Sequence, residues 1–248
     1  QYWSEDEELQ KIHDEFSENT LTNFFIPLGI APNFLIDNKN YTIPMAIEES
    51  SVVAAACKSA KFWSKRGGFK TEIINVIKTG QVHFKFNGDK NKLYEFFENS
   101  KSKILNDCNE ISENMLARGG GILNINLIDK TSEISDYYQL SSDFNTVDSM
   151  GANFINSCLE QFAKSFETEF LESKLFDEDE NLEIVMSILS NYVPQCLVKA
   201  EVRCKLNELK NVDVEEPIKF ARKFIDAVEI AKNDISRAVT HNKGIMNG

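Results

Sequence analysis

Two long amphipathic patterns in the middle of the chain limit what it can fold into. The apolar residues of the first are Leu93, Phe97, Ile104, Cys108, Ile111 and Met115. Those of the second are Ile155, Leu159, Phe162, Phe166 and Phe170. Spacings of three, four and seven place such residues on one helical face. We therefore predict helices over 91–116 and from about 150, separated by strands at "ILNINLID" (122–129) and "YYQLSSDFNTV" (137–147).

The flanking segments add further elements on both sides of this middle region. Residues 4–18 have the pattern of an acidic amphipathic helix, and three prolines predict short strands and loops over 26–45. An alanine-rich helix should begin at Ser50 or Ser51, end at Gly67–Gly68, and be buried. Residues 71–90 predict a hairpin that turns at Thr79–Gly80.

The remaining third completes a mixed α/β or α+β fold. Strands are expected at 184–191 and 197–206, and Pro217 opens a further amphipathic helix. This order favours a middle subdomain inserted into an outer one.

Charge and cysteine usage exclude several classes of function. A net charge of -12 disfavours nucleic acid and anionic membranes, both of which attract positive potential. No apolar run approaches the 18 residues of a membrane span. The five cysteines are odd in number and lack the paired spacing of a zinc site, so we expect free thiols in a reducing cytoplasm and no metal.

Three segments carry residues suited to chemistry. In "PMAIEESSVVAAA" (44–56), Glu48 and Glu49 precede a helix, where a carboxylate ordinarily stabilises the helix start. Next to a buried helix, such a carboxyl group would instead have a raised pKa and serve as a proton donor. The residues themselves leave both interpretations open.

The second segment is "VDSMGANFINSCLE" (147–160). Asp148 is a candidate helix N-cap, and Gly151 would let a phosphate approach free backbone N–H groups, although small residues also serve helix packing. Asp129 ends a strand and suits either a ribose contact or a turn. The glycines at 119–121 lack the lysine of a phosphate loop and are expected to form a flexible entry to a strand.

The third segment is "ISRAVTHNKGIMNG" (235–248). It places Arg237, Lys243 and Asn247 on what we expect to be a glycine-bounded loop after a helix. A lysine held there is suited to stabilising an oxyanion, and an ordinary solvated loop lysine is the alternative.

Together these segments resemble the soluble class II hydroxymethylglutaryl-CoA reductases of bacteria and archaea. The similarity runs from "SENTLTNFFIPLGIAPNFLI" through "PMAIEESSVVAAACKSAK", "GGFKT", "ARGGG", "DSMGANFIN" and "MSILSN" to "RAVTHNKGIMNG". The "DSMGAN" and "THNKGIMNG" segments are the most specific to this family.

The resemblance implies a homodimer with active sites at the subunit interface, and the free thiols expected above agree with a cytoplasmic protein. The same resemblance implies a large acyl-CoA-binding domain (1–74 and 194–248) interrupted by a small dinucleotide-binding domain (75–193). The implied reaction uses NADH or NADPH to reduce the hydroxymethylglutaryl-CoA thioester to mevalonate and free CoA, a step toward isoprenoids. No metal, nucleic acid or membrane is implied.

The resemblance also assigns roles to individual residues. Glu49 would be the proton donor and Lys243 the oxyanion-stabilising lysine. Substrate positioning would fall to Ser51, Arg237 and Asn247. The residues matching the cofactor motif are Asp148, Met150, Gly151 and Asn153.

The sequence departs from the family pattern in two places. Ser50 replaces a proline common in class II, and the family's catalytic aspartate and histidine would follow beyond Gly248. We therefore expect the 248 residues alone to be an inactive fragment. A non-catalytic CoA- or nucleotide-binding homologue is the alternative.

Overall fold

The computed structural model describes residues 2–211 and 216–247 and divides into two compact units. We call residues 1–72 and 200–248 the outer unit, and residues 73–199 the inserted unit. The outer unit contains α1 (Glu7–Glu15), β1 (Leu28–Ile36), β2 (Lys39–Ala46), α2 (Val52–Ser64), the 3-10 helix η1 (Leu206–Asn211), α6 (Pro217–Asn233) and α7 (Ile235–Asn247). The inserted unit contains α3 (Lys90–Asn106), α4 (Asn109–Ala117), β4 (Gly121–Asp129), β5 (Tyr137–Asn145), α5 (Ala152–Glu172) and β6 (Leu182–Leu189). Strands β3 (Lys70–Phe86) and β7 (Cys196–Glu201) carry the chain from one unit into the other.

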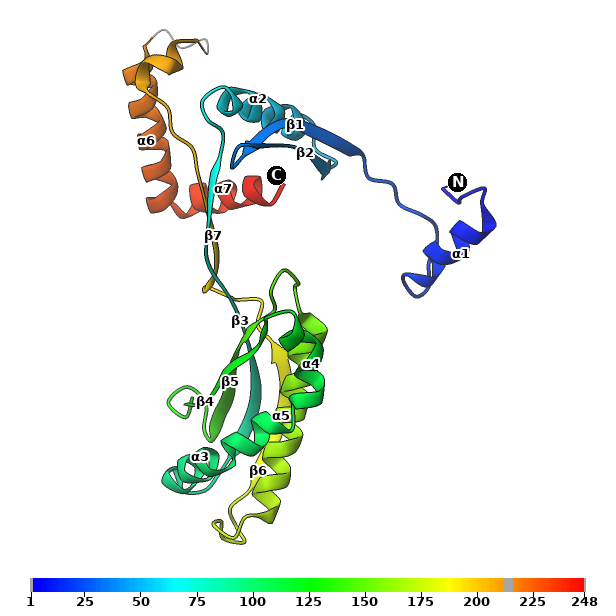
Figure 1. Ribbon diagram of the computed structural model, residues 1–248, viewed down its shortest axis with the longest axis vertical. Helices are drawn as coiled ribbons and strands as arrows, with labels where there is room; N and C mark the ends of the chain where they lie inside the picture. Colours follow the sequence, from blue (N-terminus) through cyan, green and yellow to red (C-terminus); the bar gives the residue numbers. More distant parts are fainter. Residues whose placement is uncertain (1, 212–215, 248) are drawn as a thin grey trace. The chain divides into compact units, whose positions relative to one another are not determined.

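The inserted unit is an antiparallel sheet covered on one face by helices (Figure 1). The strand order is β4-β5-β3-β6, and β7 also pairs with β3. The predicted apolar stripe of α5 is confirmed, because Ile155, Leu159, Phe162, Phe166 and Phe170 are all buried. They pack with alternate residues of the strands, such as Val82, Phe84 and Leu140, in one core cluster. The predicted mixed helix-and-strand class is confirmed as well.

Strand β3 contradicts the predicted hairpin at Thr79–Gly80. Residues 70–86 form one continuous strand, in which Gly80 pairs with Ser142 on one side and Leu189 on the other. A Cβ atom at Gly80 would lie 2.6 Å from Cδ1 of Leu159. The glycine therefore marks the close approach of α5 to the sheet and not a turn.

The predicted helix over 91–116 is also divided in two. It is interrupted at Asp107 and Cys108, between α3 and α4. The Asp107 carboxylate accepts a hydrogen bond from Ser165 Oγ at 2.6 Å, and buried Cys108 donates to the carbonyl of Cys158 at 3.7 Å. These contacts give the polar groups at the interruption partners on α5. The apolar stripe continues from α3 into α4.

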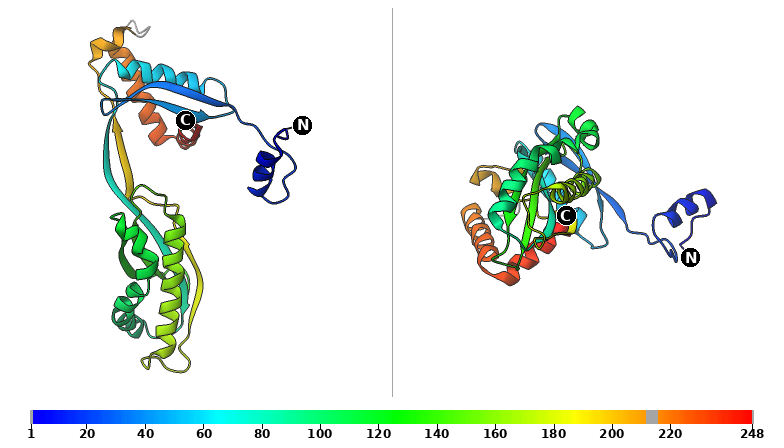
Figure 2. Two further views of the ribbon diagram at one scale, coloured as in Figure 1. Left: turned by 45° about the vertical axis from the view of Figure 1, so that its right-hand side comes forward. Right: turned by 90° about the horizontal axis from the view of Figure 1, so that it is seen from below.

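The outer unit is built around the β1–β2 hairpin, on which α2 packs (Figure 2). Asp37 and Asn38 have φ values of 46° and 69°, as the two central residues of a tight hairpin turn require. The strands are longer than the prolines suggested. Pro32 lies at a break in the register, where the strand needs no regular hydrogen bond, and Pro44 pairs opposite Ile30.

Helix α2 does not have the burial that its alanines predicted. Ala60 is its one buried residue. One side of the helix faces β1, where Val53 approaches Gly29, and the other side faces an apolar pocket of about 440 Å³ shared with Leu209, Phe220 and Phe224. No helix within the described ranges is long and apolar enough to cross a bilayer.

Candidate functional site

The outer unit brings Glu49, Lys243 and Asn247 into direct contact. Oε2 of Glu49 accepts hydrogen bonds from Lys243 Nζ at 2.6 Å and from Asn247 Nδ2 at 2.5 Å. Glu49 lies in the turn between β2 and α2, and its two donors lie on α7. A cation, an amide and a carboxyl group therefore meet at one point, although 194 residues separate Glu49 from Lys243.

The segment that carries Lys243 and Asn247 is helical, which corrects the predicted loop. Residues 235–247 form α7, and Gly248 lies outside the described residues. A glycine inside a helix costs about 1 kcal/mol relative to alanine. The packing of α7 on α6 and the contacts with Glu49 offset that cost. The helix also explains the geometry, because residues four apart lie on the same helical face.

The turn that presents Glu49 has a strained backbone. Ser51 occupies the N-cap position of α2, as predicted, but its φ is 71° and its side chain makes no capping hydrogen bond. A left-handed conformation in a residue other than glycine costs about 1–3 kcal/mol and is frequent at functional sites. The Ser51 hydroxyl thus remains available beside Glu49 in the sequence.

The Glu49 site is more open than the sequence suggested. The side chains of Glu49 and Lys243 are 48% and 62% exposed. Of the two interpretations that the sequence left open for Glu49, the structure shows the exposed carboxylate and not the desolvated one. What the structure does provide is the proximity of the two charged groups.

Arg237 lies apart from this contact. It is in the first turn of α7, and its backbone N–H donates to Asp234 Oδ1 at 2.8 Å. Its six-residue spacing from Lys243 rotates it to a different face of the helix. There it lines a pocket of about 300 Å³ between α6 and α7, together with Phe224, His241 and Asn242.

In the inserted unit, the predicted cofactor residues gather at the N-terminus of α5. Gly151 is the N-cap residue, with a φ of 74°, and a Cβ there would lie 2.3 Å from Thr146 Cγ2. No side chain caps the helix, so N–H groups of its first turn remain available to a ligand. Exposed Asp148, Met150 and Asn153 surround this point. An uncapped helix N-terminus of this kind can donate hydrogen bonds to a phosphate group.

The prediction that Asp148 caps this helix is wrong. Thr146 and Ser149 form a tight turn before the helix, in which Ser149 N–H donates to the Thr146 carbonyl at 3.1 Å. Asp148 is exposed on that turn, and Gly151 takes the cap position because only a residue without Cβ fits beside Thr146.

Of the three glycines predicted to form a flexible entry to β4, Gly120 and Gly121 are closely packed, whereas a Cβ at Gly119 would meet no atom within 4 Å. A Cβ at Gly120 would lie 2.4 Å from the carbonyl oxygen of Asn145 and 3.0 Å from Val147 Cγ2. Gly121 has a φ of 133°. These residues let the start of β4 approach the turn that precedes α5.

Asp129 lies at the other end of β4 from this turn. It pairs with Tyr138, whereas Gly121 pairs with Asn145 next to the turn. Eight residues of extended strand correspond to about 26 Å. The Asp129 carboxylate bonds Lys90 and the Thr131 backbone, and these bonds lower its pKa to about 2. Of its two predicted roles, the structure shows the turn and does not bring Asp129 to the proposed cofactor residues.

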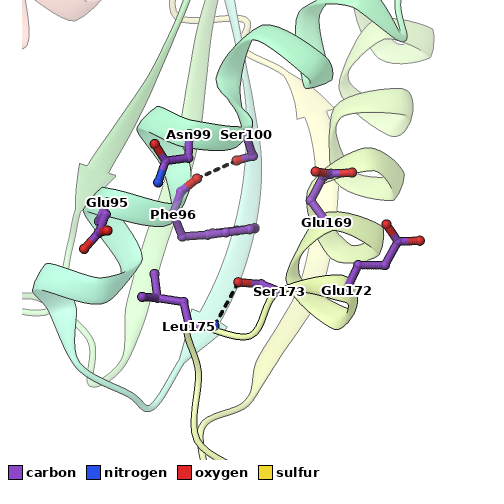
Figure 3. Close-up of a pocket in the computed structure, with 8 residues that line it drawn as sticks. All are labelled: Glu95, Phe96, Asn99, Ser100, Glu169, Glu172, Ser173 and Leu175. Atoms are coloured by element: carbon purple, nitrogen blue, oxygen red, sulfur yellow. Dashed lines mark hydrogen bonds between the residues drawn. The ribbon is translucent and has the colours of Figure 1, made fainter.

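A separate pocket of about 360 Å³ lies at the C-terminal end of α5 (Figure 3). Its acidic residues are Glu95, Glu169 and Glu172, and Phe96 and Leu175 add apolar surface. Glu169 is paired with Lys103. Three carboxylates make this pocket unsuitable for a pyrophosphate. Within the described ranges, no His, Cys, Asp or Glu side chains group in a way that could hold a metal ion.

The structure adds Lys78, a residue that the sequence analysis missed. Its Nζ donates to Thr146 Oγ1 at 2.8 Å and to the Ser149 carbonyl at 2.5 Å. In β3, Lys78 lies on the same face as Gly80 and Val82, which are buried. A lysine on the core-facing side of a strand was the available signal, and the wrongly predicted hairpin concealed it.

The chain resembles known reductases along almost its whole length. Residues 2–248 match the family model described as hydroxymethylglutaryl-coenzyme A reductase. The 3-hydroxy-3-methylglutaryl-coenzyme A reductase of Archaeoglobus fulgidus is 34% identical over 239 residues, which cover 96% of this chain and 51% of that protein. A probable reductase of the same description from Borreliella burgdorferi is 31% identical over 242 residues, with coverages of 95% and 52%. The chain spans about half the length of these curated relatives.

Solved structures agree with the sequence comparisons. The reductase of Streptococcus pneumoniae superimposes with a TM-score of 0.82 at 30% identity, over 96% of this chain and 54% of that one. A second structure, described as the class II enzyme of the same organism bound to NADPH in open conformations, gives a TM-score of 0.80 at 30% identity, over 96% of this chain and 61% of that one. From the family model and these relatives together, the chain belongs to the hydroxymethylglutaryl-coenzyme A reductase family.

Proposed function

We propose that this chain provides the substrate- and cofactor-binding residues of a class II reductase that converts hydroxymethylglutaryl-CoA to mevalonate and CoA. The observation that carries the proposal is the contact of Lys243 and Asn247 with one oxygen of Glu49. The family match and the shared fold support the substrate class. The outer unit would bind the acyl-CoA and the inserted unit the dinucleotide.

The two charged residues suit the two needs of thioester reduction. Reduction of a thioester to an alcohol takes two hydrides at the carbonyl carbon, which reduced nicotinamide bound at this site would supply in turn. The C–S bond breaks between the two additions, and CoA leaves as a thiolate that takes up a proton. Negative charge develops on the carbonyl oxygen at each addition, and a fixed ammonium at Lys243 stabilises it, on the scale of about 2.7–4 kcal/mol for one oxyanion donor. The resulting alkoxide needs a proton, which the Glu49 carboxyl group would deliver in the substrate complex, where exclusion of water favours its protonated form.

The hydrogen-bond geometry makes this division of roles possible. Lys243 Nζ lies 2.6 Å from Glu49 Oε2, so a carbonyl oxygen that accepts from Lys243 also comes within reach of the carboxyl group. Asn247 Nδ2 holds the same carboxyl oxygen and limits its rotation. Ser51, on its strained turn, would position the acyl group next to Glu49, and Arg237 would bind a more distant part of it.

The cofactor would bind at the turn before α5. Gly151, the uncapped first turn of α5 and the exposed side chains of Asp148, Met150 and Asn153 form the proposed contacts. The NADPH-bound class II structure supports a nicotinamide cofactor.

We infer no metal requirement, a cytoplasmic location and a homodimer. Exposed apolar side chains of the outer unit, such as Phe24 and Phe25, support association with a second copy, which sedimentation would test.

The decisive experiment is oxidation of NADH or NADPH in the presence of hydroxymethylglutaryl-CoA by the protein that carries this sequence. Lys243→Ala should reduce turnover at least about 100-fold, the scale of a lost oxyanion donor, with the dissociation constant of the cofactor nearly unchanged. Lys219→Ala is the matched control, because Lys219 is an exposed helical lysine paired with Glu216. An equal loss of cofactor affinity and rate in Lys243→Ala would contradict the role proposed for this lysine.

A further inference from the structure

The turn before α5 is conformationally costly. We call residues 146–151 the α5 turn. Val147 has a φ of 52°, which is rare for a β-branched residue, and Gly151 has a φ of 74°. Thr146, which is 1% exposed, is pressed against the position that a Cβ of residue 151 would take. A segment of this kind keeps its shape only where its surroundings hold it.

Lys78 makes long-range hydrogen bonds that hold the α5 turn. Within the turn, Thr146 Oγ1 donates to the Ser149 carbonyl at 2.7 Å, and Ser149 Oγ donates to the Thr146 carbonyl at 2.8 Å. The Lys78 ammonium bonds both the Thr146 hydroxyl and the Ser149 carbonyl, from 68 and 71 residues away in the sequence. The backbone of Lys78 is itself fixed by its pairing with Phe144 in the sheet.

The ammonium also adds charge at the proposed cofactor site. A cation next to the turn offsets the exposed carboxylate of Asp148 and adds to the positive potential of the α5 N-terminus. A neutral side chain of the same length would fill the space without supplying either the charge or both donors.

We propose that Lys78 is a positioning residue for dinucleotide binding: it locks the α5 turn and supplies positive charge toward the pyrophosphate. This inference rests on the proposed function of the same site. Lys78 acts on the cofactor site through its bonds to Thr146 and Ser149. We therefore expect its loss to weaken cofactor binding.

Titration of the protein with NADH and with NADPH tests the proposal. Lys78→Met should raise both dissociation constants roughly three- to thirtyfold, because a helix-terminal charge contributes on this scale. Lys78→Arg, which keeps the charge, should restore most of the affinity, and Lys78→Gln should restore little. The effect of Lys78→Met should also shrink as salt is raised, since ions screen the charge. Lys85→Met is the matched control, because Lys85 is a half-buried lysine of β3 that also donates to a backbone carbonyl, that of Ser135.

Hydrogen exchange of residues 149–154 without ligand separates this inference from the proposed function. Faster exchange there in Lys78→Met, but not in Lys85→Met, is expected if Lys78 holds the turn. Unchanged exchange together with unchanged affinity would overturn the inference. If the unaltered protein bound neither cofactor, the proposed cofactor site would fail, and the exchange data would still decide whether Lys78 orders the turn. Should Lys78→Met not fold, the contrast between Lys78→Arg and Lys78→Gln decides in its place.

Discussion

The two units of this chain bury their apolar residues to very different degrees. Among the described residues, the buried apolar side chains of the outer unit are Ala31, Met45 and Ala60, whereas those of the inserted unit include a continuous cluster of phenylalanines. The apolar residues of α6, such as Phe224 and Ile225, are largely exposed. The inserted unit therefore has a core of its own, while the residues proposed for proton and oxyanion chemistry belong to the unit with little core.

Most of the apolar burial that stabilises the fold therefore lies in the inserted unit, whereas the proposed proton and oxyanion chemistry lies in the outer unit. The Glu49–Lys243 contact is exposed, and an exposed ion pair contributes at most about 1 kcal/mol to folding. The proposed cofactor turn, in contrast, adjoins the dense core through Gly80, Ile155 and Leu159. Paired substitutions, one in each unit, test this contrast through their effects on the free energy of unfolding.

The largest effect is expected for Phe166→Ala in the inserted unit. Phe166 is fully buried, and its ring centroid lies 5.2 Å from that of Phe84 and 5.1 Å from that of Phe96. Its removal should lower the free energy of unfolding by about 3–5 kcal/mol. Urea denaturation followed by circular dichroism measures the change. Phe224→Ala in the outer unit is the control, since that residue is 63% exposed and the loss of its ring should cost about 0.5 kcal/mol or less. Equal costs would refute the contrast between the units.

An intermediate effect, of opposite sign in the two units, is expected for glycine-to-alanine substitutions. A Cβ at Gly80 would lie 2.6 Å from Leu159 Cδ1 and 3.2 Å from Leu189 Cα. Gly80→Ala should therefore destabilise the protein by about 1–3 kcal/mol. Gly244→Ala in α7 meets no atom within 4 Å and should gain about 0.5–1 kcal/mol of helix stability. Thermal unfolding of both variants checks the signs, and a stabilising Gly80→Ala would show that α5 can withdraw from β3.

The smallest effect concerns the acid stability of the inserted unit. Bonds from the Lys92 ammonium and from the backbone N–H groups of Asp89 and Asp177 lower the pKa of Glu180 to about 2. A pKa below the unfolded value stabilises the protein above about pH 4.5, and this contribution is lost as the pH falls toward 2. Glu180→Gln should flatten the pH dependence of the unfolding midpoint over that interval. Glu178→Gln, in the same acidic loop, should leave the pH dependence of the unfolding midpoint unchanged. If both variants gave the same profile, the bonds of Glu180 would not be the source of that dependence.

Periodic residues allowed much of the fold to be predicted, and glycines accounted for most of the errors. The stripe from Ile155 to Phe170 was predicted correctly because burial of a long helix repeats a signal several times. A single glycine is compatible with a turn, with close packing in a strand and with a helix interior, so it does not identify the element that contains it. Gly80 permits close packing within a strand, and Gly244 lies within a helix, yet both were assigned to turns or loops. What distinguishes these uses is the neighbouring element, which local sequence does not contain.

The candidate site was predictable only in part, for a related reason. Glu49 and Lys243 were each noted as candidates in their own segments, but only the family resemblance joined them in one site, because no local pattern links positions so far apart. Their meeting depends on the turn after β2 and on the face of α7. Lys78 was missed because its importance arises from Thr146 and Ser149, on another segment. Asp129, chosen as a strand-end acid, instead bonds Lys90 and Thr131.

Helix α5 has a consequence for how charged molecules approach the inserted unit. Its 21 residues span about 30 Å, with Lys78 near the first turn and Glu169 and Glu172 near the last. The peptide dipoles of the helix point the same way as these charges. The unit therefore carries a permanent electric polarity along α5. The helix dipole and these side chains therefore favour an anion at the glycine end of α5 over the glutamate end, and this preference should weaken as ionic strength rises.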